Sequence, residues 1–263
     1  MTEHPTTEPP MTEPPTSEPP TSEHAMAEHL RSGPLAGSTA VVTGASRGIG
    51  RSIALRLAEA GAAVALWARD ADALQRVADE IAACGGRALP MVCDITDSAA
   101  VNSTADAVRR ALPPVRVVVN NAGAVLRKPT LAISDIEWRR VIAVNLDGTF
   151  HVTVAFLPDL IRTGGRIINI SSIAGREGTA MLAAYCAAKH AVVGFTRALA
   201  EELRTAKVSV NAICPGSVDT VMLREGMPGA SPDMSPDDIA RTALFLAHTA
   251  PSALTGACID VFG

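Results

Sequence analysis

The chain has 263 residues, of which 48% are hydrophobic, 19% charged and only 3% aromatic, and its formal net charge is −4. This length is enough for one sizeable α/β core, so a single folded domain is expected. The mildly acidic balance, without a stripe of clustered Lys and Arg, argues against a nucleic-acid partner. Apolar runs such as residues 62–68 are far shorter than the roughly 18 to 20 residues that cross a bilayer, so no membrane partner is expected.

The first 25 residues parse as the pentads MTEHP, TTEPP, MTEPP, TSEPP and TSEHA. Pro, Thr and Glu dominate this segment, so it has too little apolar surface to offset the entropy of ordering. We therefore expect a disordered tail over residues 1–33 and one domain over residues 34–263. The tail has neither the basic nor the apolar region of a secretory signal. A linker, a docking tail and a later translation start at Met11 or Met26 remain alternatives.

Beyond the tail, apolar runs alternate with helical periodicity. The apolar runs predict strands at residues 40–43, 63–67, 88–93, 115–119, 166–170, 208–213 and 257–261. The periodic segments predict helices at residues 48–60, 71–84, 99–111, 134–162, 182–204 and 236–248. Because the strands are apolar enough to be covered on both faces, this alternation predicts an α/β fold with a parallel, doubly wound sheet. Ligands of such sheets bind at the carboxyl ends of the strands.

A glycine-rich octapeptide, residues 43–50, follows the first predicted strand and begins the first predicted helix. Gly44, Gly48 and Gly50 lack the β-carbon that would block a tight turn and the close approach of a pyrophosphate to the backbone. The helix N-terminus then presents free N–H groups and partial positive charge to the phosphates. The spacing predicts a nucleotide site, although three nearby glycines alone could also form an ordinary loop.

A second group of residues indicates acid–base chemistry. Tyr185 and Lys189 lie four residues apart in one predicted helix, so they share a face, and Ser172 precedes them. An ammonium group near the phenol is expected to lower its pKa from the usual value near 10. Tyr185 could then give its proton to a substrate oxygen, to which Ser172 would donate a hydrogen bond. Tyr185 is the only tyrosine of the chain.

Taken in order along the chain, these motifs resemble the short-chain dehydrogenase/reductase family. The matching segments are Thr43–Gly50, Asp94–Thr96, Asn120–Gly123, Asn145, Ser172, Tyr185-x-x-x-Lys189 and Pro215–Gly216, and the resemblance covers residues 35–263. It implies a Rossmann-type seven-stranded sheet in the order 3-2-1-4-5-6-7. It also implies a catalytic set of Asn145, Ser172, Tyr185 and Lys189, in which Asn145 holds a water that connects Lys189 to solvent.

The resemblance further implies which residues hold the dinucleotide. Asp94 would bind the adenine amine with backbone help from Ile95, and Lys189 would bond the nicotinamide ribose. The expected cofactor-binding residues are Gly44, Ser46, Arg47, Gly48, Ile49, Gly50, Arg69, Asp94, Ile95, Asn121, Ala122, Gly123, Tyr185, Lys189, Pro215, Gly216 and Thr220.

The end of the second predicted strand favours NADP(H) over NAD(H). Family members that prefer NAD typically have a carboxylate there, whereas this chain has Ala68. Arg69 and Arg47 offer two guanidinium groups to the 2′-phosphate, and guanidinium pairs well with such a dianion. The alternative is that both arginines are solvated and that Asp70 partly neutralises Arg69.

The sequence thus predicts an NADP(H)-dependent carbonyl reductase in the cytoplasm, similar to the 3-oxoacyl-acyl-carrier-protein reductase branch. An NAD-linked alcohol dehydrogenase and a non-catalytic cofactor-binding protein remain alternatives. The expected partner is a small carbonyl or alcohol substrate, and the resemblance implies a homodimer or homotetramer formed through the helices at 134–162 and 182–204. Five scattered cysteines read as reduced thiols, and no metal site is expected. Residues 221–235, with three methionines and two glycines, are expected to form a mobile segment over the substrate.

Overall fold

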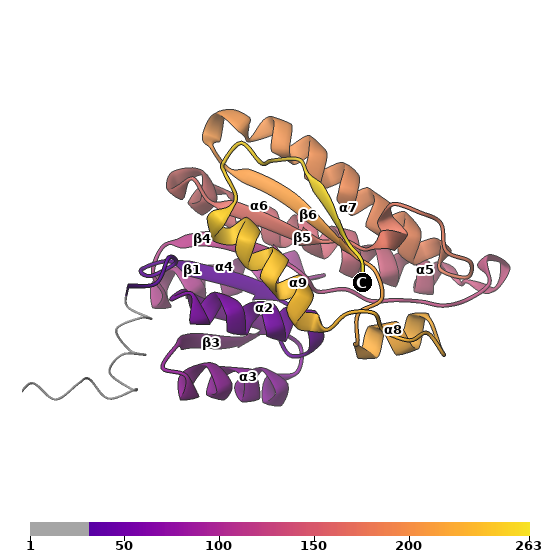
Figure 1. Ribbon diagram of the computed structural model, residues 1–263. Helices are drawn as coiled ribbons and strands as arrows, with labels where there is room; N and C mark the ends of the chain where they lie inside the picture. The colour runs from indigo at the N-terminus through magenta and orange to yellow at the C-terminus, as the bar shows by residue number, and fades with distance from the viewer. Residues whose placement is uncertain (1–31) are drawn as a thin grey trace, which may run out of the picture.

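The structure, a computed structural model, describes residues 32–263, so the expectation of disorder for residues 1–31 lies outside the described residues. A parallel sheet of seven strands runs through the molecule in the order β3-β2-β1-β4-β5-β6-β7 (Figure 1). The strands are β1 Thr39–Thr43, β2 Ala63–Ala68, β3 Arg87–Val92, β4 Val115–Asn120, β5 Arg166–Ile170, β6 Ser209–Pro215 and β7 Cys258–Val261. The predicted Rossmann-type α/β fold and its strand order are confirmed.

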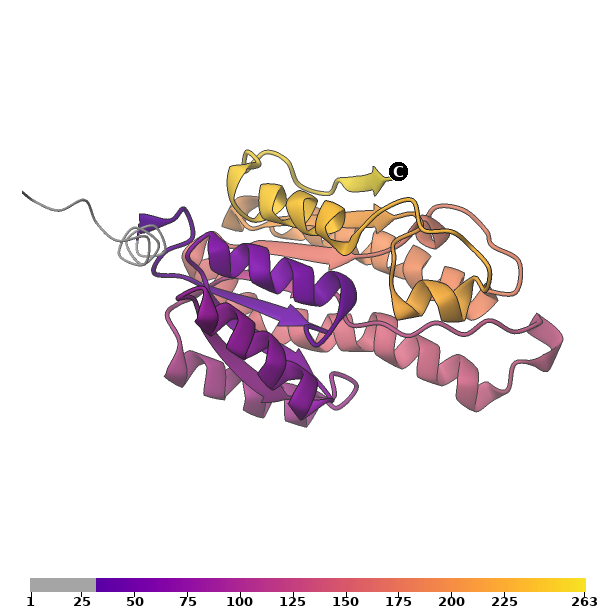
Figure 2. The same cartoon turned by 60° about the horizontal axis from the view of Figure 1, so that its bottom comes forward.

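Helices cover both faces of the sheet (Figures 1 and 2). On one face lie α2 Gly48–Glu59, α3 Ala71–Ala83 and α9 Pro236–Leu244, which share a core with β1 and β2. On the other lie α4 Ser98–Ala111, α6 Gly148–Thr163 and α7 Ala183–Glu202, around the buried Trp67, Phe156 and Leu160. Because both faces are covered, every residue of β1 is buried, including the polar Thr39 and Thr43 at its two ends.

The strand order reverses beside β1, which pairs with β2 on one side and with β4 on the other. The loops that leave β1 and β4 therefore diverge to opposite faces of the sheet and leave a crevice at the carboxyl ends, the usual ligand position in this fold. The short helices α5 Asp135–Ile142 and α8 Val221–Gly226 lie beyond the same ends of the strands (Figure 2).

The helix predicted over residues 134–162 is interrupted in the structure. Between α5 and α6, residues Ala143–Asp147 form a π-helical turn. The combined run Asp135–Thr163 is long and apolar enough, by length and composition, to cross a membrane, and 44% of its most apolar window is buried. Its inner face packs on β4 and contains Val152, Phe156 and Leu160, so the run fits the core helix of a globular domain.

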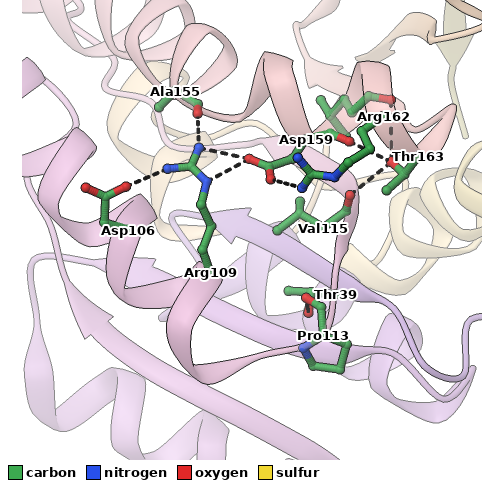
Figure 3. A network of polar contacts seen from close by, with 10 residues as sticks. Thr39, Asp106, Arg109, Pro113, Val115, Ala155, Asp159, Arg162 and Thr163 are labelled. Atoms are coloured by element: carbon green, nitrogen blue, oxygen red, sulfur yellow. Dashed lines mark hydrogen bonds and ion pairs between the residues drawn. The ribbon is translucent and has the colours of Figure 1, made fainter.

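A buried carboxylate fastens α6 to α4. The Asp159 side chain is 4% exposed and accepts from Arg109 Nε at 2.8 Å and Arg162 Nη2 at 2.6 Å (Figure 3). Arg109 also binds Asp106 and the Ala155 carbonyl, so its guanidinium bridges the two helices. A buried charge is tolerated only when it is paired and hydrogen-bonded in this way. The network holds α6, and with it the π-helical turn, in a fixed position against the sheet.

Two further segments differ from prediction. Residues 221–235, predicted as a mobile segment over the substrate with no helix, contain α8, whose N-cap is Thr220. The helix predicted over 236–248 ends as α-helix at Leu244 and continues as a π-helical turn, Phe245–Thr249. Neither change moves a predicted site residue away from the carboxyl ends of the strands.

Candidate active site

The glycine-rich turn between β1 and α2 is held by the segment after β4. The Thr43 hydroxyl accepts from the backbone N–H groups of Asn121 and Ala122, both at 3.0 Å. The Asn121 side-chain amide donates to the carbonyls of Thr43 at 2.9 Å and Gly44 at 3.2 Å. These hydrogen bonds satisfy backbone groups of a turn that has no regular structure of its own, and they fix its shape.

The glycines of the turn are required by close packing. A β-carbon on Gly50 would lie 2.2 Å from the Gly44 carbonyl oxygen and 2.4 Å from the Asn121 amide nitrogen. Gly44 and Gly48 have φ of +64° and +55°, in the left-handed region that favours glycine. Ser46 and Ile49 lie in the same turn, with Ile49 packed on the core. A backbone surface of this kind, followed by the α2 N-terminus, fits a pyrophosphate group.

Tyr185 lies in the first turn of α7, and the residue is 8% exposed. Its hydroxyl donates to the Met222 thioether of α8 at 3.9 Å. Burial raises the pKa of Tyr185 to about 12, and a hydrogen bond with Ser172 opposes that rise. The Ser172 hydroxyl also caps the 3-10 turn Ile173–Gly175 by accepting from Ala174 N–H at 3.1 Å. The structure therefore brings Ser172 and Tyr185 together, as predicted.

Lys189 lies one turn further along α7, also buried, with its Nζ 5.7 Å from the centroid of the Tyr185 ring. The Nζ donates to the Ile170 carbonyl at 2.8 Å. Burial lowers the pKa of Lys189 to about 8. The expectation that this ammonium lowers the pKa of Tyr185 is wrong for this arrangement, because removal of the phenol from water outweighs the neighbouring groups and raises its pKa.

Asn145 lies at the centre of the π-helical turn and is fully buried. Its side-chain amide donates to the carbonyls of Ala124 at 2.8 Å and Val141 at 2.9 Å. A β-carbon on Gly123 would lie 2.8 Å from Asn145 Oδ1 and 3.6 Å from Lys189 Nζ, so the three residues are neighbours. The amide hydrogens of Asn145 thus position the loop after β4, and its part in a proton relay stays a prediction.

The residues predicted for the adenosine end lie at the ends of β2 and β3. Asp94 accepts from the N–H and hydroxyl of Thr96 at 3.0 and 2.8 Å, and these bonds, with a smaller effect of Arg69, lower its pKa. Ile95 is buried, and its carbonyl lies 3.0 Å from His151 Nδ1. Asp70 caps α3 by accepting from Ala73 N–H at 2.9 Å, and no ion pair joins it to Arg69 within residues 32–263.

The segment after β6 meets the glycine-rich turn from the other side. A β-carbon on Gly48 would lie 3.3 Å from Thr220 Cγ2. Gly216 N–H donates to the Val261 carbonyl at 2.9 Å, which fixes the end of β6 at Pro215. The predicted residues after strands β1, β4, β5 and β6 therefore surround one region.

Two residues that shape this region have roles that sequence reasoning missed. Thr43 was part of the motif, but its hydroxyl gave no sign of joining β1 to β4. Met222 was placed only in a mobile segment, whereas it contacts the Tyr185 hydroxyl and has its Cε 3.7 Å from a β-carbon built on Gly123. An unpredicted helix, α8, provides that contact. Residues 32–263 contain no cluster of His, Cys, Asp and Glu that could hold a metal ion.

Comparison with known proteins agrees with this geometry. The short chain dehydrogenase family matches residues 38–229. The 3-oxoacyl-[acyl-carrier-protein] reductase FabG of Pseudomonas aeruginosa is 36% identical over 241 residues, which cover 87% of this chain and 97% of the relative. A provisionally assigned NAD(P)-dependent gluconate 5-dehydrogenase from Beutenbergia cavernae, with NADP bound at low occupancy, superposes with a TM-score of 0.80 at 40% identity, covering 86% of this chain and 95% of its own. A variant of actinorhodin polyketide ketoreductase with NADPH gives a TM-score of 0.81 at 34% identity, with coverage of 86% and 96%.

The chain belongs to the short-chain dehydrogenase/reductase family of oxidoreductase enzymes. Within that family it is similar to the 3-oxoacyl-acyl-carrier-protein reductases, as predicted from the motifs.

Proposed function

We propose that the protein is an NADP(H)-dependent reductase of ketones or aldehydes. The observation that carries this proposal is the buried Tyr185, in contact with Ser172 and Lys189, next to Gly123 and the glycine-rich turn. The cradle fits a dinucleotide because Gly44, Gly48 and Gly50 leave no room for side chains along it. The P. aeruginosa relative is named a 3-oxoacyl-[acyl-carrier-protein] reductase and the actinorhodin enzyme a polyketide ketoreductase, and both names support a ketone substrate.

In this proposal each residue of the site has its own chemical role. The bound nicotinamide would supply the hydride. Tyr185 Oη gives its proton to the substrate oxygen, and Ser172 donates a hydrogen bond to the same oxygen as negative charge develops on it. Lys189 holds the nicotinamide ribose and returns a proton toward Tyr185, and Asn145 fixes the loop through Ala124 against which both are packed.

The preference for NADP(H) rests on Arg47 and Arg69. Both side chains are exposed at the adenosine end, and neither forms an ion pair within the described part of the chain. The competing carboxylate, Asp70, is occupied as the cap of α3. Two unpaired guanidinium groups suit a dianionic 2′-phosphate. The NADP and NADPH bound in the two solved relatives support the same choice.

The direct test is a panel of carbonyl compounds screened for NADPH oxidation. The panel should include 3-oxoacyl thioesters, cyclic ketones and keto sugar acids, each repeated with NADH. Reduction of at least one class, faster with NADPH, is the expected result. A panel with no turnover, although NADPH binds, would favour a non-catalytic cofactor-binding protein instead.

Ketone reduction should depend on pH through Lys189. Because burial lowers the pKa of this lysine to about 8, its ammonium is present below that pH and is lost as the pH rises through it. Tyr185, with a pKa of about 12, stays protonated across the same range. We expect kcat/KM for reduction to fall above about pH 8, and the residual activity of Lys189→Met to lack this step. A flat profile through pH 9.5 would contradict the assignment.

We also propose that the protein assembles as a homodimer or homotetramer through α6 and α7. Phe150, Val154 and Ile161 of α6 are 47% to 49% exposed and lie on one stripe, with Phe195 of α7 edge-on to Phe150 at 6.4 Å. An exposed apolar stripe of this kind marks an interaction surface.

The five cysteines are all free thiols, which supports a cytoplasmic location.

This assembly predicts a change in mass. Phe150→Asp combined with Val154→Asp places two charges in the stripe and should shift light scattering toward the 27.2 kDa of one chain. Leu131→Asp, at an exposed apolar residue outside the stripe, is the control and should leave the assembly intact. An unchanged mass in the double variant would place the interface elsewhere.

A further inference from the structure

The segment of residues 125–128, here called the strap, contacts two other parts of the chain near Tyr185. One is the residue pair just before α7, and the other is the end of α8. Lys128 N–H donates to the Met181 carbonyl at 2.8 Å, just before α7. At the other side, Val125 Cγ2 lies 3.0 Å from a β-carbon built on Gly226, the last residue of α8. Val125 and Leu126 also pack on the apolar cluster that contains Tyr185. The strap therefore forms one wall of the region in front of Tyr185.

Helix α8 lies between Tyr185 and the charged end of the strap. Met222, near its N-terminus, contacts the Tyr185 hydroxyl. At its C-terminus, Arg127 Nη1 donates to the Gly226 carbonyl at 3.3 Å and lies 3.8 Å from Met227 Sδ. Four residues of α-helix rise about 6 Å. The phenol and the Arg127 guanidinium thus contact two positions of α8 that are separated by about 6 Å along the helix axis.

Arg127 is the cation of this wall that has no carboxylate partner. Its neighbour Lys128 is held by both oxygens of Glu137 at 2.9 Å, and Arg224 of α8 is held by Asp219 at 2.7 Å. Within residues 32–263, no ion pair involves Arg127. Its two long hydrogen bonds, to the Gly226 carbonyl and to Met227 Sδ, both come from Nη1 and leave Nη2 and Nε without a hydrogen-bond partner in the described part of the chain. Such a group binds a carboxylate or phosphate in bidentate fashion.

We propose that Arg127 is a specificity-determining residue that binds an anionic group of the substrate, a carboxylate or a phosphate, about one turn of α8 away from the carbonyl that Tyr185 protonates. This inference rests on the proposed ketone reduction. It identifies the substrate class as ketones with a distal anion. The neutral walls provided by Val125, Leu126 and Met222 would contact the apolar part between the two groups.

The test uses a homologous series of methyl-ketone carboxylates with lengthening methylene linkers, each paired with its neutral methyl ester. One linker length should give a kcat/KM for the carboxylate at least roughly tenfold above that for its ester, the effect of one charge-assisted hydrogen bond. The corresponding oxoalkyl phosphates distinguish a phosphate from a carboxylate as the preferred anion. The preference should weaken at high ionic strength, because the site is exposed.

Arg127→Gln should abolish the preference while leaving the rates with esters unchanged, and Arg127→Lys should retain part of it. The matched control is Arg110→Gln, an exposed arginine in the last turn of α4. Equal loss for esters and carboxylates in Arg127→Gln would show that Arg127 only holds α8, and a wild-type protein without preference at any linker length would also overturn the proposal. If esters themselves are not reduced, the proposed function fails. Thermal-shift titration then tests for the anion site on its own. Only the carboxylates should stabilise the wild type, and neither the carboxylates nor the esters should stabilise Arg127→Gln.

Discussion

Replacing Tyr185 by phenylalanine is expected to slow ketone reduction by at least roughly a hundredfold, the scale of a lost general acid. The substitution removes one oxygen and keeps the ring of a buried residue, so the packing of α7 should be preserved. Because Tyr185 is the only tyrosine, no other phenol can take over the proton transfer. Single-turnover rates with a saturating ketone measure the chemical step directly.

The binding control separates an enzyme from a cofactor-binding protein. NADPH affinity, measured by fluorescence titration, should be nearly unchanged in Tyr185→Phe. In Lys189→Ala, both affinity and rate should fall, because the same ammonium would hold the ribose and support the proton transfer. Turnover of Tyr185→Phe within a few fold of wild type would rule out the proposed mechanism.

Replacing Arg47 or Arg69 by alanine is expected to weaken NADPH binding by roughly tenfold to a hundredfold, since a hydrogen bond to a charged group contributes about 1.5 to 3 kcal/mol. NADH, which lacks the 2′-phosphate, should bind nearly as before. Both side chains are exposed and have no ion-pair partner in residues 32–263, so their removal should leave the fold unchanged. Isothermal titration with both cofactors measures the two losses.

The reverse substitution provides the matched test. Ala68→Asp introduces an acceptor for the ribose hydroxyls at the end of β2 and a charge that repels the 2′-phosphate, so the preference should move toward NADH. Arg51 of α2, whose guanidinium is paired with Glu80 of α3, is a control position where alanine should not alter the choice of cofactor. Equal losses of NADPH and NADH affinity in the Arg47 and Arg69 variants would refute the assignment.

The sheet could be predicted from sequence because its strands are buried on both faces. Residues 115–119 and 166–170 are rich in Val and Ile, and each becomes a strand with bounds within one residue of those predicted. Tyr185 and Lys189 could be placed on one face because helix geometry fixes residues four apart. The grouping of the glycine-rich turn, Asn121 and Thr220 depended on the family resemblance, since no local pattern relates them.

The remaining features depend on tertiary contacts. The π-helical turn at Asn145 left no signal, because residues 134–162 keep an uninterrupted helical pattern with no proline at the break. Helix α8 is only six residues long, too short for periodicity to reveal. The predicted direction of the Tyr185 pKa shift was wrong. The sequence spacing places Lys189 near the phenol, but it does not reveal that Lys189 Nζ donates to the Ile170 carbonyl or that the phenol is so completely buried.

The hydrogen bonds between Thr43 and Asn121 have a consequence for folding. They join residues 78 positions apart, and between them lie α2, β2, α3, β3, α4 and β4. Contacts of such long sequence separation form late, because the entropy of closing the intervening chain must first be offset. The glycine motif is therefore not a portable loop: a polypeptide that ends before Asn121 contains all of its glycines but lacks the donors that shape it. During synthesis, the cradle for the pyrophosphate can be completed only after the fourth strand has left the ribosome and paired with the first.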